Sequence, residues 1–409
     1  MFYVKTVSQA IKDCKAVIKQ KTQKQVVAIE QALGCILAED ISAKENIPEF
    51  ARSTVDGFAV KAEDTFGTSE NLPSFLQVTH EILMGQEATE TLYAGQAQKI
   101  ATGGMLPPGS NAVVMQEYTE HIDGMLTLYR AASPGENVIK VGEDLTKGQV
   151  VFQTGHRIRP QDIGILAAMG IVEIQVIEPL RVAVLSTGDE LVVPETQKLQ
   201  FGQIRDTNGY SVRAYLQQQQ YVVDYHGIIA DNYKALHDKV HSLYADYDVM
   251  ILSGGSSVGT KDVTSDIIAT LPDANIEIHG IAIKPGKPTI IATSREKLLI
   301  GLPGHPVSAL VVMQHVIDPL LAYMQNVRVD RYHPTVRAKI DQNIDSQTGR
   351  TDVIRVKISE QQDGALWATP LLGKAGVFSS LVKADGYIIV AESVEGIGKG
   401  SEVEIFLYK

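Results

Sequence analysis

Three short apolar runs in the middle of the chain constrain its fold most strongly, because each ends in a polar turn that contains glycine. The runs cover residues 181–185, 248–252 and 297–300, and the turns cover 186–190, 253–262 and 301–306. Helix-like segments at 208–219, 232–246 and 306–325 alternate with these runs. Strands that alternate with helices predict a parallel sheet with helices on both faces.

The segments on either side predict further domains, and 409 residues correspond to two to four of them at roughly 150 residues each. Helical spacing predicts one helix over 8–20 and a second helix with its exit over 25–41. Short β-rich runs between turns fill 46–140, and 142–176 holds a turn and a helix around 163–168. Beyond a polar linker at 326–334, strand runs alone predict a small barrel or sandwich. The predicted class is therefore multi-domain α/β and β.

Composition excludes some partners. Lys plus Arg is 37 and Asp plus Glu is 48, a formal charge of −11, which argues against a general nucleic-acid binder. No apolar run approaches the roughly 18 to 20 residues of a membrane span, and the first residues show no signal-peptide pattern. Cys14 and Cys35 form no CxxC pair. These features predict a cytoplasmic protein that binds neither nucleic acid nor membrane.

The three turns predict a binding site, because ligands of such sheets lie beyond the carboxyl ends of the strands. Gly254 and Gly255 follow Ser253, and they allow backbone amides to approach an anion. Asp189, Glu190 and Asp262 would add carboxylates beside this anion site. A bridging cation explains that combination, and Mg²⁺ fits because it takes oxygen ligands while contacting phosphate. The alternative is that Asp189 and Asp262 merely cap the turns that follow them.

A proline-stiffened turn at 284–288 carries two lysines three residues apart. Lys284 and Lys287 can present two ammonium groups to one phosphate or tetrahedral oxyanion, although two solvated surface lysines are the alternative.

Two other constellations are weaker. His237 and His241 mimic a two-histidine zinc helix but lack an evident third ligand. Ser186, Ser253 and His305 could form a hydrolase triad, yet no GxSxG elbow is present.

An ordered set of motifs spans essentially the whole chain and resembles the MoeA family, the molybdopterin molybdotransferases of molybdenum-cofactor synthesis. The motifs are STVDGFA (53–59), TGGMLPPGSNAVV (102–114), GED (142–144), STGDEL (186–191), SGGSSVG (253–259), KPGKP (284–288), GLPGHPVSA (301–309), TGRTD (348–352) and ADG (384–386).

The resemblance implies four domains and a homodimer. A discontinuous dimerisation domain would comprise 1–45 and 141–176, a β-rich insert 46–140, a molybdopterin-binding α/β domain 177–326, and a C-terminal β-barrel domain 327–409. The resemblance places the active site at a subunit interface, where Asp56 of one subunit would face the α/β domain of the other. The molybdopterin adenylyltransferase and molybdoenzyme-maturation proteins would be further partners.

The implied reaction consumes adenylylated molybdopterin and molybdate, releases AMP, and inserts molybdenum into the dithiolene. The resemblance assigns Asp189, Glu190 and Asp262 to Mg²⁺ and the pyrophosphate, and Lys284 and Lys287 to molybdate or phosphate. It places two further acids in the pocket, Asp56 and Asp144. Substrate contacts would come from Ser253, Gly254, Gly255, Asp206, Asn208, Asp231, Pro303, Gly304 and Arg350. Asp144 as a turn cap and Arg350 as a hairpin salt bridge are alternatives.

This sequence departs from the family pattern at a few positions. His305 stands in place of the usual Asn, Asn111 in place of Asp, and Gly104 and Ala375 in place of Ala and Ser. Only Lys140 remains of an often arginine-rich stretch before GED.

Three other functions compete with this interpretation. The adenylyltransferase that makes the activated pterin is typically a single domain, which the insert argues against. A non-catalytic scaffold of the same fold could lose active-site carboxylates, and this chain keeps them. A paralogue that uses tungstate would have the same sequence features, because the two oxyanions have nearly the same size and charge.

Overall fold

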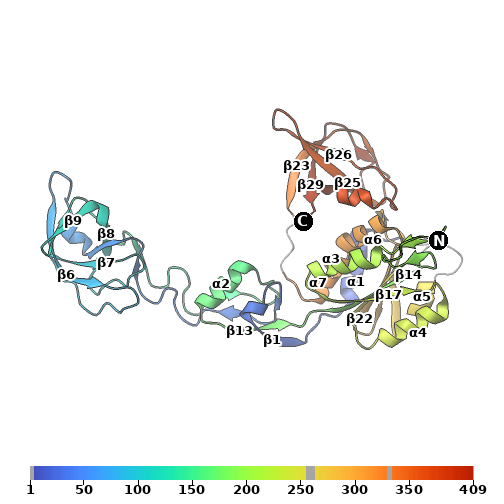
Figure 1. The fold of residues 1–409 in the computed structure, drawn as a ribbon, viewed down its shortest axis with the longest axis horizontal. Helices are drawn as coiled ribbons and strands as arrows, with labels where there is room; N and C mark the ends of the chain where they lie inside the picture. Colours follow the sequence, from blue (N-terminus) through green and yellow to red (C-terminus); the bar gives the residue numbers. More distant parts are fainter. Residues whose placement is uncertain (1–3, 255–262, 329–333, 409) are drawn as a thin grey trace.

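The computed structural model describes residues 4–254, 263–328 and 334–408, and it shows an elongated molecule made of four bodies. In Figure 1 an α/β body with β14, β17 and β22 lies at one end, and a β body with β6 to β9 lies at the other. A small body with α2, β1 and β13 connects them, and a barrel with β23 to β29 lies beside α6 of the α/β body. We call these the α/β, distal, central and barrel modules.

The α/β module is built on a six-stranded sheet in the order β17-β14-β18-β22-β21-β19. The first four strands are parallel, whereas β21 runs antiparallel to both of its neighbours, β22 and β19. This sheet confirms the predicted α/β fold class. The strands are β14 (Arg181–Thr187), β17 (Val222–Ile229), β18 (Val249–Ser253), β19 (Ala274–His279), β21 (Ile290–Ser294) and β22 (Lys297–Leu302), with a small parallel pair, β15 (Leu191–Val192) and β16 (Ile204–Arg205).

Helices cover both faces of this sheet, which explains its continuous apolar runs. Along β14, Val182 and Val184 face one buried cluster with α3 and α6, while Ala183 and Leu185 face a second with α4 and α5. The helices are α3 (Asn208–Gln218), α4 (Tyr233–Leu243), α5 (Val263–Ile268), α6 (Pro306–Val312) and α7 (Asp318–Met324), with the π-helical segment η4 (Met313–Ile317) joining the last two.

The segment α6–η4–α7 is a continuous helix from Pro306 to Met324, and its length and composition are those of a membrane-crossing helix. Gln314, His315 and Asp318 interrupt its apolar sequence, so it is not an uninterrupted apolar run. The segment is 67% buried within the molecule, and Val311, Ile317 and Leu321 pack into the core beside the sheet.

Helix α1 (Val7–Val17) packs on the α/β module. Its position in the sequence, just before β1, would instead group it with the central module. Ala10, Cys14 and Ile18 lie in the same buried cluster as Val182. Burial raises the pKa of the Cys14 thiol to about 12. The cause of this docking is the apolar face of α1, which the α/β core buries.

The central module contains a strand where the sequence predicted a helix over 25–41. Val26 and Val27 lie in β1, which pairs antiparallel with β13. β-branched residues fit this pleated surface better than a helix. The elements are β1 (Lys24–Ala28), the 3-10 turn η1 (Ile29–Gln31), β2 (Ile36–Leu37), β3 (Ile41–Ser42), β12 (Val150–Phe152), α2 (Pro160–Ala168) and β13 (Glu173–Ile177). Helix α2 confirms the helix expected around 163–168.

The distal module is a six-stranded sheet in the order β8-β5-β7-β6-β10-β9, as the β-rich composition predicted. A two-stranded ribbon, β4 with β11, leads into it. The elements are β4 (Arg52–Ser53), β5 (Gly57–Val60), η2 (Ala62–Thr65), β6 (Ser74–Ile82), β7 (Gln96–Ile100), β8 (Ala112–Met115), η3 (Gln116–Tyr118), β9 (Thr119–Ile122), β10 (Met125–Leu128) and β11 (Val138–Ile139).

The barrel module closes on itself, because β25 pairs with both β26 and β27. One short helix interrupts the strand runs that the sequence predicted. The elements are β23 (Thr335–Ile340), β24 (Ile344–Asp345), β25 (Thr351–Glu360), β26 (Leu366–Pro370), α8 (Ser379–Lys383), β27 (Gly386–Val390), β28 (Gly396–Ile397) and β29 (Glu402–Leu407). Strand β20 (Ile283–Lys284) of the α/β module pairs in parallel with β25 and so joins the two modules.

Candidate active site

The three strands that precede the polar turns end side by side at one edge of the α/β sheet. Ser186 at the end of β14 is in register with Ser253 at the end of β18, and Ser253 is in register with Leu302 at the end of β22. The strand ends and the described turn residues meet as predicted, whereas 255–262 of the second turn lie outside the described residues. The edge where they meet is the candidate site.

Glycines allow the first two turns to approach each other closely. A Cβ atom on Gly254, whose φ is +106°, would lie 2.2 Å from the carbonyl oxygen of Thr187. At Gly188 a Cβ would lie 2.7 Å from the Oε2 atom of Glu190, because that carboxylate folds back over the turn. A larger residue at Gly254 would require the backbone to shift, whereas at Gly188 the Glu190 side chain would have to move away.

Asn208, at the start of α3, ties the second turn to the third. Its Nδ2 atom donates to the Ser253 Oγ and to the carbonyl oxygen of Gly304, both at 2.8 Å. Within the described residues, the buried Asn208 Oδ1 and Thr187 Oγ1 atoms have no hydrogen-bond partner. Because buried polar groups are nearly always paired, these two atoms mark a place for a ligand or bound water.

Asp206 is buried beneath the same edge and is 3% exposed. Its carboxylate accepts hydrogen bonds from the Ser186 hydroxyl at 2.8 Å, from the Gly209 amide at 3.1 Å and from the Tyr225 hydroxyl. Burial, together with the hydrogen bond to Asp206, raises the pKa of Tyr225. Asp206 therefore holds the first turn against the N-terminus of α3.

The exposed carboxylates lie at the rim of the site. Asp189 and Glu190 follow β14, and the Oδ1 atom of Asp189 accepts the backbone amide of Asp231 at 3.0 Å. Asp262 and Gly255 lie outside the described residues. Among the described residues no group of three or more His, Cys, Asp and Glu side chains is placed to hold a metal ion. Two carboxylates still suit Mg²⁺, which commonly takes one or two of them together with substrate phosphates.

The loop of residues 284–288, which we call the lysine loop, lies against α6, the helix that follows the third turn. A Cβ on Gly286 would lie 2.5 Å from a methyl carbon of Val312 in α6, so the loop rests on that helix. Lys284 and Lys287 are both exposed on this loop. Pro303 is buried within the third turn, before Gly304.

Arg350 forms an ion pair with Asp352. Its Nε and Nη2 atoms donate to the two carboxylate oxygens at 2.8 and 3.3 Å. The Nζ atom of Lys284 lies 3.7 Å from Asp352 Oδ2. The hairpin salt bridge that the sequence left open is thus present, and it reaches the lysine loop.

Arg355 was missed by the sequence reasoning. It lies on β25, is 5% exposed, and its Nε atom has no hydrogen-bond partner within the described chain. Burial lowers the pKa of its guanidinium. The sequence carries a signal for it. Arg355 lies between two apolar residues, Ile354 and Val356, and an arginine is rarely buried without a partner.

Asp56 and Asp144 do not meet these residues within one chain. Asp56 precedes β5 in the distal module, where its Oδ1 accepts the Thr102 amide at 2.7 Å. Asp144 lies between β11 and β12, where its backbone amide donates to Ile47. Figure 1 shows the distal sheet at the far end of the molecule from β14 and β17.

The departures from the family pattern have local structural settings. Asn111 accepts the Ala62 amide at 2.7 Å and donates to the Glu63 carboxylate, which an aspartate could not do. His305 and Ala375 lie together where the barrel module meets α6. The Val307 amide donates to the Ala375 carbonyl at 3.3 Å.

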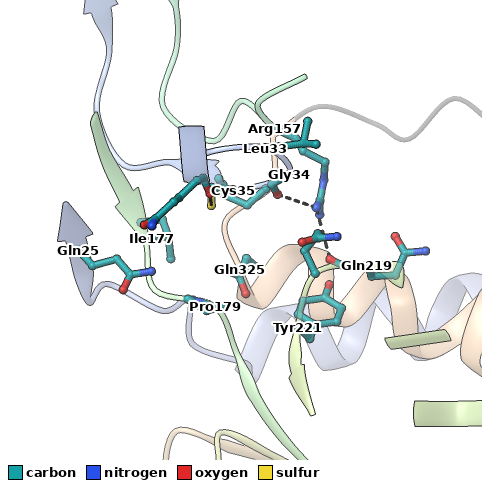
Figure 2. A pocket seen from close by; sticks show the side chains of 13 residues that line it. Gln25, Leu33, Gly34, Cys35, Arg157, Ile177, Pro179, Gln219, Tyr221 and Gln325 are labelled. Carbon is teal, nitrogen blue, oxygen red and sulfur yellow. Dashed lines mark hydrogen bonds between the residues drawn. The ribbon is translucent and has the colours of Figure 1, made fainter. Parts of the chain in front are cut away.

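A cavity of about 180 Å³ lies at the junction of the central and α/β modules, apart from the sheet edge. Figure 2 shows Arg157 at its rim, with Gln25, Cys35 and Gln325 around it. The Arg157 Nη1 atom donates to the carbonyl oxygens of Gly34 at 3.0 Å and Gln219 at 3.4 Å, one in each module. This cavity lies where the two modules join, and we call this junction the hinge.

A mostly parallel α/β sheet with glycine-containing turns at its carboxyl edge, joined to a closed barrel, defines a class of multi-domain α/β proteins whose ligands bind at that edge. Family models for the MoeA N-terminal region (domains I and II), a probable molybdopterin-binding domain and the MoeA C-terminal region (domain IV) match residues 5–170, 183–323 and 337–408. The chain belongs to the MoeA family.

Full-length relatives support this membership. A molybdopterin molybdenumtransferase of Haemophilus influenzae is 34% identical over 388 residues, covering 94% of each chain. One from Staphylococcus epidermidis is 30% identical over 396 residues, covering 96% of this chain and 94% of the relative. The crystal structure of a molybdopterin biosynthesis MoeA protein from Pyrococcus horikoshii OT3 superposes with a TM-score of 0.85 at 29% identity, covering 99% of this chain and 100% of that one.

Proposed function

We propose that this enzyme is a molybdopterin molybdenumtransferase that inserts molybdenum into molybdopterin, the activity for which its relatives are named. The observation that carries the proposal is the sheet edge with two buried atoms, Thr187 Oγ1 and Asn208 Oδ1, that have no hydrogen-bond partner among the described residues, close to exposed carboxylates. The lysine loop on α6 adds positive charge. Although the chain has a net charge of −11, Lys284 and Lys287 place positive charge where an anionic substrate would bind.

In this proposal, the phosphoanhydride of adenylylated molybdopterin is hydrolysed, AMP leaves, and molybdate supplies the metal for the dithiolene. Lys284 and Lys287 bind the oxyanion, because a phosphoanhydride beside molybdate concentrates negative charge that ammonium groups offset. Asp206 and Asn208 hold the turns in place around the pterin and nucleotide. The remaining substrate contacts come from Asp231, Ser253, Gly254, Gly255, Pro303, Gly304 and Arg350.

Asp189 and Glu190, together with Asp262, would hold Mg²⁺ at the rim. When bound, that ion would neutralise charge on the phosphate oxygens. Asp189 also fixes the neighbouring turn by accepting the Asp231 amide. The Mg²⁺ dependence of activity separates these two roles. Loss of an Mg²⁺ ligand in Asp189→Asn would raise the Mg²⁺ concentration needed for half-maximal activity. An altered turn would instead lower activity at every Mg²⁺ concentration.

We further propose a cytoplasmic homodimer with the four-part domain division implied by the family motifs. Asp56 and Asp144 belong to the same site only if a second subunit brings its distal module to the α/β module of the first. The distance between these modules along one chain supports that arrangement. Partners that deliver the pterin or receive the product would dock on this dimer.

The test is AMP release from adenylylated molybdopterin with Mg²⁺, with and without molybdate. We expect release that depends on molybdate and yields active cofactor. Release that tungstate supports and molybdate does not would identify the tungstate paralogue. No release from a folded dimer would refute the enzyme proposal and favour a scaffold of the same fold.

A further inference from the structure

We propose that Asp352 of the barrel module is a positioning residue, which holds Lys284 of the α/β module in the orientation that binds the oxyanion. The inference rests on the proposed function for the role of Lys284, but the contact itself is a property of the fold. In this proposal the barrel module contributes a residue that orients a substrate-binding side chain.

The backbone brings Asp352 and Lys284 together across a module boundary. Strands β20 and β25 pair in parallel, with Lys284 in register with Asp352 and Ile283 in register with Thr351. The Thr351 amide donates to the carbonyl oxygen of Ala282 at 2.9 Å. The two side chains therefore meet because the two strands form one ladder, and any slip of the barrel would separate them.

The three charged side chains of this cluster differ greatly in exposure. The Asp352 side chain is 3% exposed, Arg350 is 29% exposed and Lys284 is 58% exposed. Arg350 binds both carboxylate oxygens and so fixes the plane of the Asp352 carboxylate. Lys284, a flexible chain with a strongly hydrated head, is the group whose freedom this fixed carboxylate restricts.

A carboxylate beside an anion site needs an explanation, since it repels the anion that the lysines attract. Within the described residues, this cluster has two cations and one carboxylate, which leaves it a single net positive charge. If charge alone mattered, replacing Asp352 by a neutral residue would tighten anion binding. If orientation matters, the same replacement would weaken binding, because Lys284 would have to be ordered at the moment of binding. We infer that orientation dominates.

The experiment compares Asp352→Asn with the wild-type full-length protein in molybdate titrations and in turnover. We expect the molybdate Kd and the KM for molybdate to rise about fivefold, the size of effect typical for a partly exposed ion pair. The kcat at saturating molybdate should change less than twofold. Asp341→Asn is the matched control, since this half-buried barrel aspartate accepts from Thr369 and has no cation among its contacts in the described chain. It should leave both constants unchanged.

A Lys284→Ala background separates positioning from a general effect on the barrel. In that background, Asp352→Asn should have no further effect on molybdate binding, because its target is gone. Additive effects, or binding by Asp352→Asn that is unchanged or tighter, would overturn the inference. Should Asp352→Asn fail to fold, Asp352→Glu keeps the charge and shifts it by one methylene, and it should show a smaller rise in Kd.

A crystal structure of Asp352→Asn tests the contact independently of the reaction. Lys284 should lose its defined position while β20 and β25 stay paired, and a Lys284 that is ordered as in the wild type would contradict the proposal. If the wild type neither binds nor uses molybdate, the proposed function fails, and this structural outcome still decides whether Asp352 orients Lys284.

Discussion

Gly254 lies so close to Thr187 that the turn after β18 can exist in this form only with glycine, because any Cβ would stand 2.2 Å from the Thr187 carbonyl oxygen. The contact joins two of the three turns that form the candidate site. It also places the buried Thr187 hydroxyl, which has no partner in the described chain, at the meeting point of β14 and β18. This relationship makes the geometry of the edge testable.

Gly254→Ala should destabilise the α/β module by about 2 kcal/mol or more and lower turnover at least tenfold, because strain and a steric clash act together. Gly227→Ala is the matched control, since Gly227 lies in β17 with a φ of +83° and nothing within 4 Å of its added Cβ. That control carries the backbone strain alone and should cost about 1 kcal/mol. Thermal unfolding and AMP release measure both effects, and equal losses in the two variants would contradict the clash.

Asp206→Asn should lower both stability and activity, because three donors currently point at its carboxylate. An amide group cannot accept all three hydrogen bonds, and a buried donor left unsatisfied costs about 1–3 kcal/mol. Tyr225→Phe removes one donor and leaves the carboxylate paired with Ser186 and Gly209, so its loss should be smaller. Denaturant unfolding ranks the variants, and the reverse order would show that Asp206 does not organise the turn.

Subunit complementation tests the shared site. At a Mg²⁺ concentration that just saturates the wild type, Asp56→Asn and Asp189→Asn should each leave the homodimer nearly inactive. After the two variants are unfolded together and refolded as an equal mixture, half of the dimers are mixed and each has one intact site, so about a quarter of the activity should return. A mixture that stays inactive, although mass spectrometry detects mixed dimers, would contradict a site formed by Asp56 of one subunit and Asp189 of the other.

Arg157→Ala should loosen the hinge between the central and α/β modules, because one guanidinium nitrogen bridges the Gly34 and Gln219 carbonyl groups. Small-angle scattering should show a broader distribution of distances within the molecule, while the unfolding temperature of the α/β module stays the same. Arg157→Lys tests the reach of this contact, since the lysine side chain is one bond shorter than the path to the arginine Nη1 atom and lacks its planar guanidinium. An unchanged scattering profile in both variants would assign the hinge to other contacts.

The ion-pair network around Asp162 predicts a pH dependence in the central module. Burial acts to raise the pKa of this carboxyl, but hydrogen bonds from Arg159 and His156 outweigh it and hold the pKa below its ordinary value of 3.8. A lowered carboxyl pKa stabilises the fold above the unfolded value, and that stability is lost as the pH falls through the folded value.

Hydrogen exchange of the α2 amides measures this effect in wild type and Asp162→Asn. The wild-type helix should be more protected by about 2 kcal/mol between pH 5 and 7, the scale of a broken buried pair. The difference should shrink below pH 3.8. A difference that is constant down to pH 2 would mean that the carboxylate charge contributes nothing.

Local pattern was sufficient for the core of this fold. Parallel strands buried on both faces are continuous apolar runs, so residues 181–185, 248–252 and 297–300 predict three strands, and the turns that follow necessarily meet at one edge. Three of the family motifs lie in those turns. A glycine there acts through the backbone conformation that it allows, and a carboxylate there lies at the sheet edge simply because it follows a strand. This is why Asp189, Ser253 and Gly254 could be selected from the sequence.

Long-range pairing decided what local pattern could not. Val26 and Val27 form a strand because β13, about 150 residues later, supplies the partner, and α1 joins the α/β module because its apolar face is buried there. The same holds for charge. The sequence by itself determined the sheet, its turns and the family. Only the tertiary structure decided that Arg355 is buried, that Asp352 reaches Lys284, and that Asp56 lies far from Asp189 in one chain. The energy of each charge depends on neighbours that are distant in sequence.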